Sequence, residues 1–502
     1  MKNSPESTID KQLSGRIDHS PDTLLVDEVL RPRFDFELAH LLSDYLYIEQ
    51  ALLSEYVRMD VMTAADAERI AQLLAAITPE KMAAQASSSM TDVAFAIEMI
   101  VLRQLDPPVP HWHVDRSRND LQACAQLMGG RRQLLEIGGE LAAFITATLD
   151  IAAATTRIPM PGHTHYQAAQ VITPGFYFTA LVDQVLQSLQ QLLVIYDLID
   201  LCPLGAGALS GQDLPWDRSR LAQILGFSGV QTHALVSVAS RHWTLRISAE
   251  LAILGVALSR FATDLLLWGS SGYRYIDLPD QLAGISSAMP QKKNFPVLER
   301  IRGRTAHMTA LFSDLAMGQR STPFTNLVEV SKEASANFLR QLESTRSTLR
   351  LFSTVLKHLT FHEDRLLALC RDEFYGGFQL ANALCLSYGI PYRRAQVLAG
   401  RYILAALEHG MTPLNVEPAL LTGLCAAEGY QVQMDREALQ TIFSVETNLE
   451  DKRSAGSTNP AAVEALLEAQ QAKFKTLVAG WEKRKQDLET VPGRLCTALD
   501  FT

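Results

Sequence analysis

Four long stretches of helical pattern constrain the fold of this chain more than any other feature. Apolar residues recur every three or four positions at about 120–156, 168–200, 234–269 and 298–358, the last with a break near Thr322-Pro323. Helices of this length need packing partners along their whole length, and the expected arrangement is a bundle of near-parallel helices. No alternation of period two is long enough to predict a sheet, so the sequence predicts an all-α fold.

The sequence divides into three predicted helical domains. Residues 1–117 form an N-terminal domain that begins with a polar, flexible arm of about 30 residues. Residues 118–363 form the central long-helix bundle. Residues 364–502 have shorter helical patterns and more turns, and they are expected to form a small C-terminal domain.

Composition and charge narrow the class of partner. The 502 residues are 47% hydrophobic and carry a formal net charge of -10, so nothing favours a nucleic acid or an anionic membrane. The six cysteines include no Cys-x-x-Cys pair, which argues against a zinc site or a disulfide framework and fits a reducing cytoplasm. The N-terminus lacks the apolar core of a signal peptide. The most apolar run, 251–268, contains Arg260 and Asp264, which favours a buried helix over a membrane span.

The stretch Gly284–Asn294 (GISSAMPQKKN) separates two of the long helical patterns and is predicted to be a loop. It holds the hydroxyls of Ser286 and Ser287, the cation of Lys292 and the amide of Asn294. With the backbone amides near the next helix start, such side chains can close over a small anion. Composition alone fits an ordinary polar turn better, but the order of the residues favours an anion site.

That order resembles the signature of the fumarase/aspartase superfamily, and the Met289–Asn294 core resembles its argininosuccinate lyase branch. The resemblance extends over about residues 90–465. Two positions differ from the pattern of the branch: Ile285 stands where Gly is usual, and Phe295 separates the Asn from the following Pro. We expect both residues to make the loop more apolar and slower to open.

A second motif, His113–Asp120 (HVDRSRND), precedes the first long helix. As a local pattern it is a helix start, in which Asp115 or Ser117 could cap the helix. Arg, Ser and Asn side chains beside free helix amides also suit a carboxylate. The stretch is similar to the His-Thr-x-Arg-Ser-Arg-Asn-Asp run of argininosuccinate lyases, which implies that Ser117 and Asn119 bind substrate carboxylate with help from Arg118.

A third motif, Met160–Gln167 (MPGHTHYQ), contains a turn and a His-x-His pair. The pair lacks a nearby third ligand, so a metal site is not expected, and a satisfied structural histidine is the simpler local interpretation. The run resembles the family sequence Met-Pro-Gly-Tyr-Thr-His-x-Gln, with His163 in place of Tyr. The resemblance implies that Thr164 binds a carboxylate and that His165 is the imidazole of the catalytic site, oriented by Glu299.

Two further stretches resemble the family. Pro203–Gly211 (PLGAGALSG) is Gly-rich, but it lacks a third spaced Gly and no strand is predicted before it, so a nucleotide site is not expected. It is similar to a family turn that is mainly structural. Ala239–His242 is similar to the Ser-Asp-Arg-Asp of the family. Arg241 is retained as a substrate contact, although an unremarkable helix cap is the local alternative.

By resemblance, the stretch 324–333 corresponds to the region in which argininosuccinate lyases contact the larger part of the substrate with Tyr, Gln and Lys. At that spacing this chain has Phe324, Glu329 and Lys332, so only the Lys is retained. Lost substrate-binding hydroxyl and amide groups are expected to change specificity, with ordinary drift on a helix face as the alternative. The first 60 residues do not match the elements that carry other amine-side contacts in the family.

The resemblance implies a reaction and a site. The reaction is anti β-elimination of an N-substituted succinate, such as argininosuccinate, to fumarate and an amine or guanidine. Ser286 is the implied base, Lys292 and the loop amides lower its pKa, and His165 stabilises charge or passes a proton to the leaving nitrogen. The implied substrate-binding residues are Ser117, Arg118, Asn119, Thr164, Arg241, Ser287, Asn294, Glu329 and Lys332. The family is tetrameric, each site takes residues from three chains, and no metal or organic cofactor is implied.

Alternatives remain at this level. The amine site could be rebuilt for a secondary pathway, in place of arginine biosynthesis, and such an enzyme could run in the additive direction. A fumarase is disfavoured by the Gln-Lys-Lys-Asn sequence of the loop. A non-catalytic scaffold, as in the lens crystallins of this family, is disfavoured because Ser286, Lys292, Asn294, His165 and Glu299 are retained together.

Overall fold

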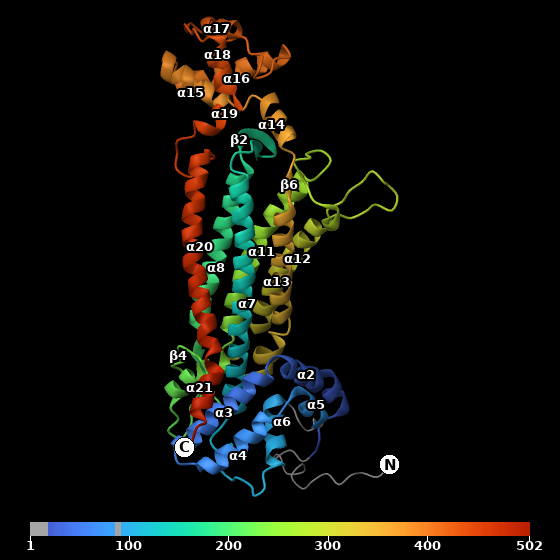
Figure 1. The fold of residues 1–502 in the computed structure, drawn as a ribbon, viewed down its shortest axis with the longest axis vertical. Coiled ribbons are helices and arrows are strands. Elements are labelled where there is room, and N and C mark those ends of the chain that lie inside the picture. Colours follow the sequence, from blue (N-terminus) through green and yellow to red (C-terminus); the bar gives the residue numbers. More distant parts are fainter. Residues whose placement is uncertain (1–18, 86–91, 502) are drawn as a thin grey trace.

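Six long helices form a bundle that runs most of the length of the molecule in the computed structural model, which describes residues 19–85 and 92–501 (Figure 1). They are α7 (Arg118–Ala154), α8 (Pro174–Ile199), α11 (His242–Trp268), α12 (Pro296–Gln319), α13 (Phe338–His358) and α20 (Pro460–Glu489). α11 packs against α8 and α12, and α7 packs against α8 and α13. The predicted all-α bundle is therefore confirmed, and so is the break between α12 and α13.

Shorter helices cover the two ends of the bundle (Figure 1). The end named here the α3 end holds α1 (Thr23–Leu25), η1 (Val26–Leu30), α2 (Arg31–His40), α3 (Leu42–Arg58), α4 (Ala64–Ala75), α5 (Pro79–Gln85), α6 (Val93–Leu102), α9 (Arg218–Ile224), α10 (Ala234–Ala239) and α21 (Val491–Ala498). The opposite end, the α16 end, holds α14 (Glu363–Asp372), α15 (Gly377–Tyr388), α16 (Tyr392–Glu408), α17 (Pro418–Ala427), α18 (Arg436–Phe443) and α19 (Val445–Glu450). Two short turns of helix, η2 (Asp280–Leu282) and η3 (Glu329–Glu333), lie in loops. Of the predicted N-terminal arm, residues 1–18 lie outside the described residues, and residues 23–30 are helical.

Three two-stranded ribbons are present in the part of the chain that the structure describes. β1 (Met160–Thr164) pairs with β2 (Gln167–Ile172), β3 (Leu201–Cys202) with β4 (Gly229–Val230), and β5 (Ile276–Asp277) with β6 (Thr360–Phe361). The helix predicted from residue 168 therefore begins later, at Pro174. Thr173 ends the strand and caps α8, because its side-chain oxygen accepts a hydrogen bond from the backbone N–H of Phe176 at 3.0 Å.

The helix α20, within the predicted C-terminal segment, was not predicted as a long helix. Its buried side chains, Val463, Leu467, Leu477 and Trp481, belong to the same core as the bundle. Gly138 of α7 makes room for Trp481, since a Cβ at that glycine would lie 2.8 Å from the indole. A separate cluster of buried apolar residues lies within 374–443, and the bounds of the three domains stay a prediction.

Three bundle helices, α7, α8 and α11, are long and apolar enough to cross a membrane by length and composition alone. Their most apolar windows are 56%, 56% and 44% buried inside the chain. On α11, Asp264 accepts a hydrogen bond from the hydroxyl of Tyr177 at 2.6 Å. Apolar side chains on the outer faces of α8 and α11 remain exposed, among them Leu198 (51%) and Ile253 (62%).

Candidate active site

The loop Gly284–Asn294 extends away from the bundle between α11 and α12 and is closed at its base (Figure 1). Gly284 and Asn294 face each other, and each backbone N–H donates to the carbonyl of the other residue, at 2.8 and 3.1 Å. Within the loop, Ser286 Oγ accepts a hydrogen bond from the N–H of Met289 at 3.1 Å. Ile285 is 95% exposed, whereas Phe295 is buried against Gly269 and anchors the end of the loop.

The two lysines of this loop have different surroundings. Lys293 Nζ lies 3.1 Å from Asp277 and 3.2 Å from Asp280, so its charge is already paired. Lys292 is exposed, and among the described residues no side-chain hydrogen bond or ion pair involves its ammonium group. Lys292 is therefore the loop cation that is available to an anionic ligand.

The β1–β2 hairpin presents the third motif, Met160–Gln167, at the α16 end of the bundle. Thr164 pairs with Gln167, so the turn consists of His165 and Tyr166 alone. Both turn residues have positive φ, 52° and 60°, as a type I′ turn requires. Neither is the Gly or Asn that such turns prefer, and strained residues of this kind cluster at functional sites. Thr164 and His165 are exposed.

His165 borders a cleft of about 460 Å³ between the hairpin and the C-terminal half of α11. Other residues of its lining are His163, Arg260, Asp264 and Tyr273. Glu299 lies in the exposed first turn of α12. Within one chain, the hydrogen bonds and ion pairs of residues 19–85 and 92–501 include none between Glu299 and His165, so the implied pairing of these two residues stays a prediction.

The start of α7 holds the first carboxylate-binding candidates. Ser117 caps the helix by accepting a hydrogen bond from the N–H of Asn119 at 3.1 Å. Asn119 donates its side-chain amide to the carbonyl of Ala208 at 3.0 Å. Arg118 donates to Asp92 at 2.9 Å and lies over the ring of Phe95.

Asp115 has a structural role in place of the capping role that the sequence left open. Its carboxylate accepts hydrogen bonds from the N–H groups of Asp213 and Leu214, at 3.1 and 2.8 Å, and from the indole of Trp216 at 2.9 Å. It therefore holds the segment 213–216 beside the start of α7.

The Gly-rich turn after α8 binds a protein carboxylate. The N–H groups of Gly205 and Gly207 both donate to Asp120 of α7, each at 3.0 Å. Both glycines have positive φ, and a Cβ at Gly205 would lie 2.6 Å from Arg218. The prediction that no strand precedes this turn was wrong, because β3 does. The amides of the turn nevertheless serve Asp120, which agrees with the predicted structural role.

Burial of Asp120 gives a pH-dependent prediction. Burial raises the pKa of this carboxyl from 3.8 to about 6, and the two glycine N–H groups only partly oppose the shift. Between pH 4 and pH 6 the carboxyl of Asp120 therefore keeps its proton in the folded state but has lost it in the unfolded state. The contribution of Asp120 to stability is therefore largest below pH 4 and is lost as the pH rises through 6.

Relative to Asp120→Asn, which does not titrate, the wild type should lose roughly 2–3 kcal/mol between pH 4 and pH 7. Thermal unfolding of both proteins at pH 4.5, 6 and 7.5 measures this difference. A difference in melting temperature that is constant over this range would contradict the assignment.

Arg241 is nearly completely buried, with 2% of its surface exposed. Its Nε donates to Gln126 at 2.7 Å, and its Nη1 donates to the carbonyls of Val238 and Ser240, both at 2.9 Å. Burial lowers the pKa of its guanidinium to about 10. The side chain of Arg241, which was predicted to contact the substrate, is therefore enclosed by other residues of the same chain, and the substrate contact stays a prediction.

The stretch that follows α12 brings Lys332 to a buried carboxylate that the sequence analysis did not identify. Lys332 Nζ lies 3.8 Å from Glu37 of α2. Glu37 also accepts hydrogen bonds from Arg33 at 3.0 Å and from Gln122 of α7 at 3.3 Å. Glu329 is exposed on η3. The sequence did contain a sign of Glu37: an acidic residue at a position of a helical pattern that is otherwise occupied by apolar, buried residues.

Glu49 was also missed. Its carboxylate forms a buried ion pair with Arg116, whose Nη1 donates at 2.8 Å, next to the predicted carboxylate site. His113 lies in the same buried group, 3.5 Å from Glu98, and burial holds the pKa of its imidazole well below the usual value.

The predicted residues fall into two groups at opposite ends of the bundle. Ser117 and Asn119 lie at the start of α7, whereas Thr164 and His165 lie just beyond its end. α7 has 37 residues, which corresponds to a length of about 55 Å. A single chain therefore does not bring the two groups together. The described residues include no group of three or more His, Cys, Asp or Glu side chains that could hold a metal ion.

Comparisons with known proteins give the class. A family model described as lyase matches residues 16–308. Argininosuccinate lyase of Rhodococcoides fascians is 30% identical over 372 residues, which cover 74% of this chain and 73% of that protein. Argininosuccinate lyase 1 of Shouchella clausii is 28% identical over 458 residues, which cover 90% of this chain and 92% of that protein.

Solved structures agree in fold. The EDDS lyase in complex with formate matches with a TM-score of 0.84 at 22% identity and covers 96% of each chain. A class II fumarase from Schistosoma mansoni matches with a TM-score of 0.67 at 15% identity and covers 84% of this chain and 92% of that chain. Family and fold together define a lyase with the long-helix architecture of the fumarase/aspartase superfamily. The chain belongs to the argininosuccinate lyase-like family within it and is a fumarate-releasing carbon–nitrogen lyase.

Proposed function

We propose that this chain catalyses anti β-elimination of an N-substituted succinate to fumarate and an amine or guanidine. The contrast between the two loop lysines carries this proposal. Lys293 is neutralised by Asp277 and Asp280, whereas Lys292 projects from the same loop into solvent close to Ser286 in sequence. A cation that has no side-chain partner among the described residues, on the same loop as a serine hydroxyl, suits a dicarboxylate from which a proton must be removed.

Ser286 is the proposed base. The difficult step removes a weakly acidic proton beside a carboxylate, and the resulting dianion needs preorganised donors. A serine hydroxyl does not ionise unaided in water. Closure of the loop over the substrate would exclude water and bring Lys292 and the loop amides to the hydroxyl, which lowers its pKa.

The remaining residues hold the substrate. Thr164, Asn294, Ser117 and Asn119 bind the two carboxylates, and the N-cap position of Ser117 places the substrate near the positive end of α7. His165, oriented by Glu299 of another chain, stabilises charge or passes a proton to the leaving nitrogen.

The site requires several copies of the chain. The two residue groups at opposite ends of α7 meet if the chains pack antiparallel along their bundles. Exposed apolar side chains on α8 and α11, among them Val194, Leu198, Ile253 and Val256, offer the surface for such packing. We therefore propose a cytoplasmic homotetramer in which three chains contribute to each site.

The amine half of the substrate is either the arginine of argininosuccinate or another amine. Phe324 and Glu329 replace the family Tyr and Gln, and Lys332 is paired with Glu37, so a rebuilt amine side is the second candidate. The test mixes the purified protein with argininosuccinate and follows fumarate by ultraviolet absorbance. Robust turnover supports arginine biosynthesis. No turnover, with fumarate still bound, directs the next experiment to a screen of amines for addition to fumarate.

Lys292→Met and Lys293→Met form a matched pair for the loop. Lys292→Met is expected to lower kcat/KM by roughly 10²–10³-fold, because it removes the unpaired cation from the dianionic intermediate. Lys293→Met is expected to stay within about tenfold of the wild type, since exposed ion pairs contribute little. Steady-state kinetics on both variants checks this, and equal losses would contradict the division of roles.

A further inference from the structure

The helix α16 has apolar side chains on two opposite faces. One face is buried in the apolar cluster within 374–443 and consists of Ala395, Leu398, Ala399, Tyr402 and Ala406. The opposite face, named here the α16 stripe, is exposed and consists of Val397, Gly400, Leu404 and Leu407. Leu404 exposes 59% of its surface and Leu407 exposes 51%. A surface helix needs only one apolar face to pack on its own core, so the second face indicates a partner outside the chain.

The α16 stripe has the spacing and the shape for a second helix. Its positions recur every three or four residues, which is the spacing of a contact between two helices that cross at a shallow angle. Gly400 lies near the middle, and no atom of the described chain lies within 4 Å of a Cβ added there. α16 lies beyond the end of the bundle (Figure 1). A partner helix can therefore approach the backbone of α16 closely.

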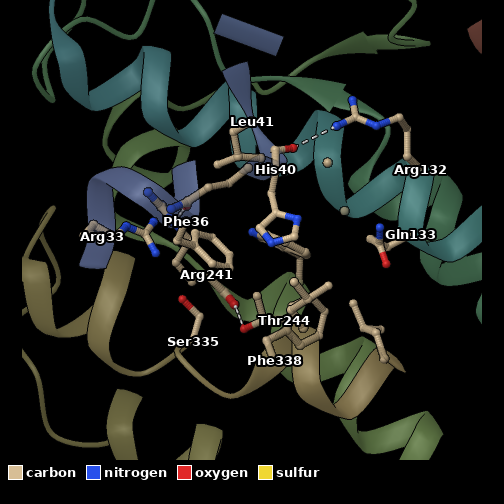
Figure 2. Close-up of a pocket in the computed structure, with 16 residues that line it drawn as sticks. Arg33, Phe36, His40, Leu41, Arg132, Gln133, Arg241, Thr244, Ser335 and Phe338 are labelled. Atoms are coloured by element: carbon tan, nitrogen blue, oxygen red, sulfur yellow. Dashed lines mark hydrogen bonds between the residues drawn. The ribbon is translucent and has the colours of Figure 1, made fainter. Parts of the chain in front are cut away.

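An unpaired charge lies at each end of the stripe. Arg393, in the first turn of α16, donates to the neutral side chain of Gln396 at 2.7 Å and has no acidic partner among the described residues. Glu408, the last residue of α16, forms no ion pair or side-chain hydrogen bond with any described residue. The arginines of the pocket at the α3 end, which Figure 2 shows, differ, because Arg33 and Arg132 have acidic partners in the same chain. The two end charges of the stripe are thus available to another molecule.

Each of these charges lies at the end of α16 that disfavours it. The N-terminal end of a helix carries partial positive charge, and the C-terminal end carries partial negative charge. Arg393 in the first turn and Glu408 in the last turn are therefore unfavourable for α16 alone. In an antiparallel pair of helices, the first turn of each helix lies beside the last turn of the other. Each charge then meets both an opposite charge and the helix end that favours it.

The order of residues along the stripe is self-complementary. Arg393 and Glu408 lie equally far from a point just after Gly400, and so do Val397 and Leu404. A twofold axis through that point would place Val397 of one copy against Leu404 of the other, and Arg393 beside Glu408 at both ends. A twofold contact between identical chains uses the same surface of each chain, as this arrangement does.

We propose that the α16 stripe binds the α16 stripe of a second copy of this chain, antiparallel, around a twofold axis near Gly400. One helix face of this length buries less than the roughly 1,200 Å² typical of stable interfaces, so the contact is weak and depends on protein concentration. It joins one oligomer to another, away from the bundle faces on which the proposed tetramer forms. The proposed reaction uses no residue of the stripe, so this inference is independent of it.

Sedimentation velocity of the full chain over a range of protein concentrations tests the contact. The mass of the wild type should rise above that of the basal oligomer as the concentration increases. Arg393→Glu and Glu408→Arg should each move this association to a concentration roughly tenfold higher or more, because each variant brings like charges together. The double variant should associate like the wild type, since its opposite charges have only exchanged places. A wild type of constant mass, or a double variant as weak as the single variants, contradicts the proposal.

A pair of cysteine variants locates the twofold axis. In chains that also carry Cys496→Ser, oxidised glutathione should link Gly400→Cys chains into dimers on denaturing gels, because backbones that meet at the axis lie within reach of a disulfide. Gly423→Cys is the matched control, since Gly423 is an exposed glycine of α17 with no described atom within 4 Å of an added Cβ. It should stay unlinked. Equal linking of the two variants, or none at Gly400→Cys, overturns the proposal. Fumarate release should be the same in both reduced variants, and its absence from every protein would count against the proposed reaction alone.

Discussion

Ser286→Ala is expected to lower kcat for fumarate release by roughly 10²–10⁴-fold, the range for loss of a positioned base. The fold should not change. Ser286 lies on an exposed loop and makes one described side-chain hydrogen bond, to the N–H of Met289. The base of the loop is closed by backbone bonds between Gly284 and Asn294, which the substitution does not touch. Initial rates, gel filtration and thermal unfolding of the variant measure the three quantities.

Ser271→Ala provides the control for this experiment, since Ser271 is an exposed serine in the segment that leads to the same loop. It should keep wild-type turnover. If Ser286→Ala also keeps turnover within a few-fold, Ser286 is not the base. If it loses both turnover and the oligomer, the loss is structural and the mechanism fails this test.

Mixed oligomers of Ser286→Ala and Asn119→Ala chains are expected to recover activity that neither variant has alone. Asn119 lies at the start of α7, while the loop that carries Ser286 follows α11 and lies toward the other end of the bundle (Figure 1). If each site takes these two residues from different chains, some sites in a mixed oligomer contain neither substitution. Co-expression with two affinity tags, sequential purification and the fumarate assay measure the recovered turnover.

The control mixes Ser286→Ala with Lys292→Met. These two residues lie on one loop, so every site receives at least one defect and no activity should return. Recovery in the control, or no recovery in the Asn119 mixture despite a stable mixed oligomer, would show that the site is not divided between chains in this way.

Local sequence patterns predicted the long helices well and the hairpin and α20 poorly. The predicted range of α7, 120–156, agrees with the observed helix Arg118–Ala154 to within two residues at each end. The agreement is close because Ser117 caps the helix and the apolar periodicity continues along it. The predicted helix 168–200 wrongly included most of β2, because six residues are too few to show a clear alternation of period two. α20 has a narrow apolar stripe, and its helix is stabilised mainly by α7 and α8, residues far away in the sequence.

The sequence by itself determined the helical class and the motifs, because helix period, caps and loop composition are local properties. Only the tertiary structure decided how the motifs relate. It pairs Lys293 and leaves Lys292 without a side-chain partner among the described residues. It joins Asp120 to the glycine amides, buries Arg241 and brings Glu37 to Lys332. It also separates the two residue groups along α7. Contacts of this kind join positions far apart in the sequence, 295 residues in the case of Glu37 and Lys332. Their geometry follows from packing that no local pattern specifies.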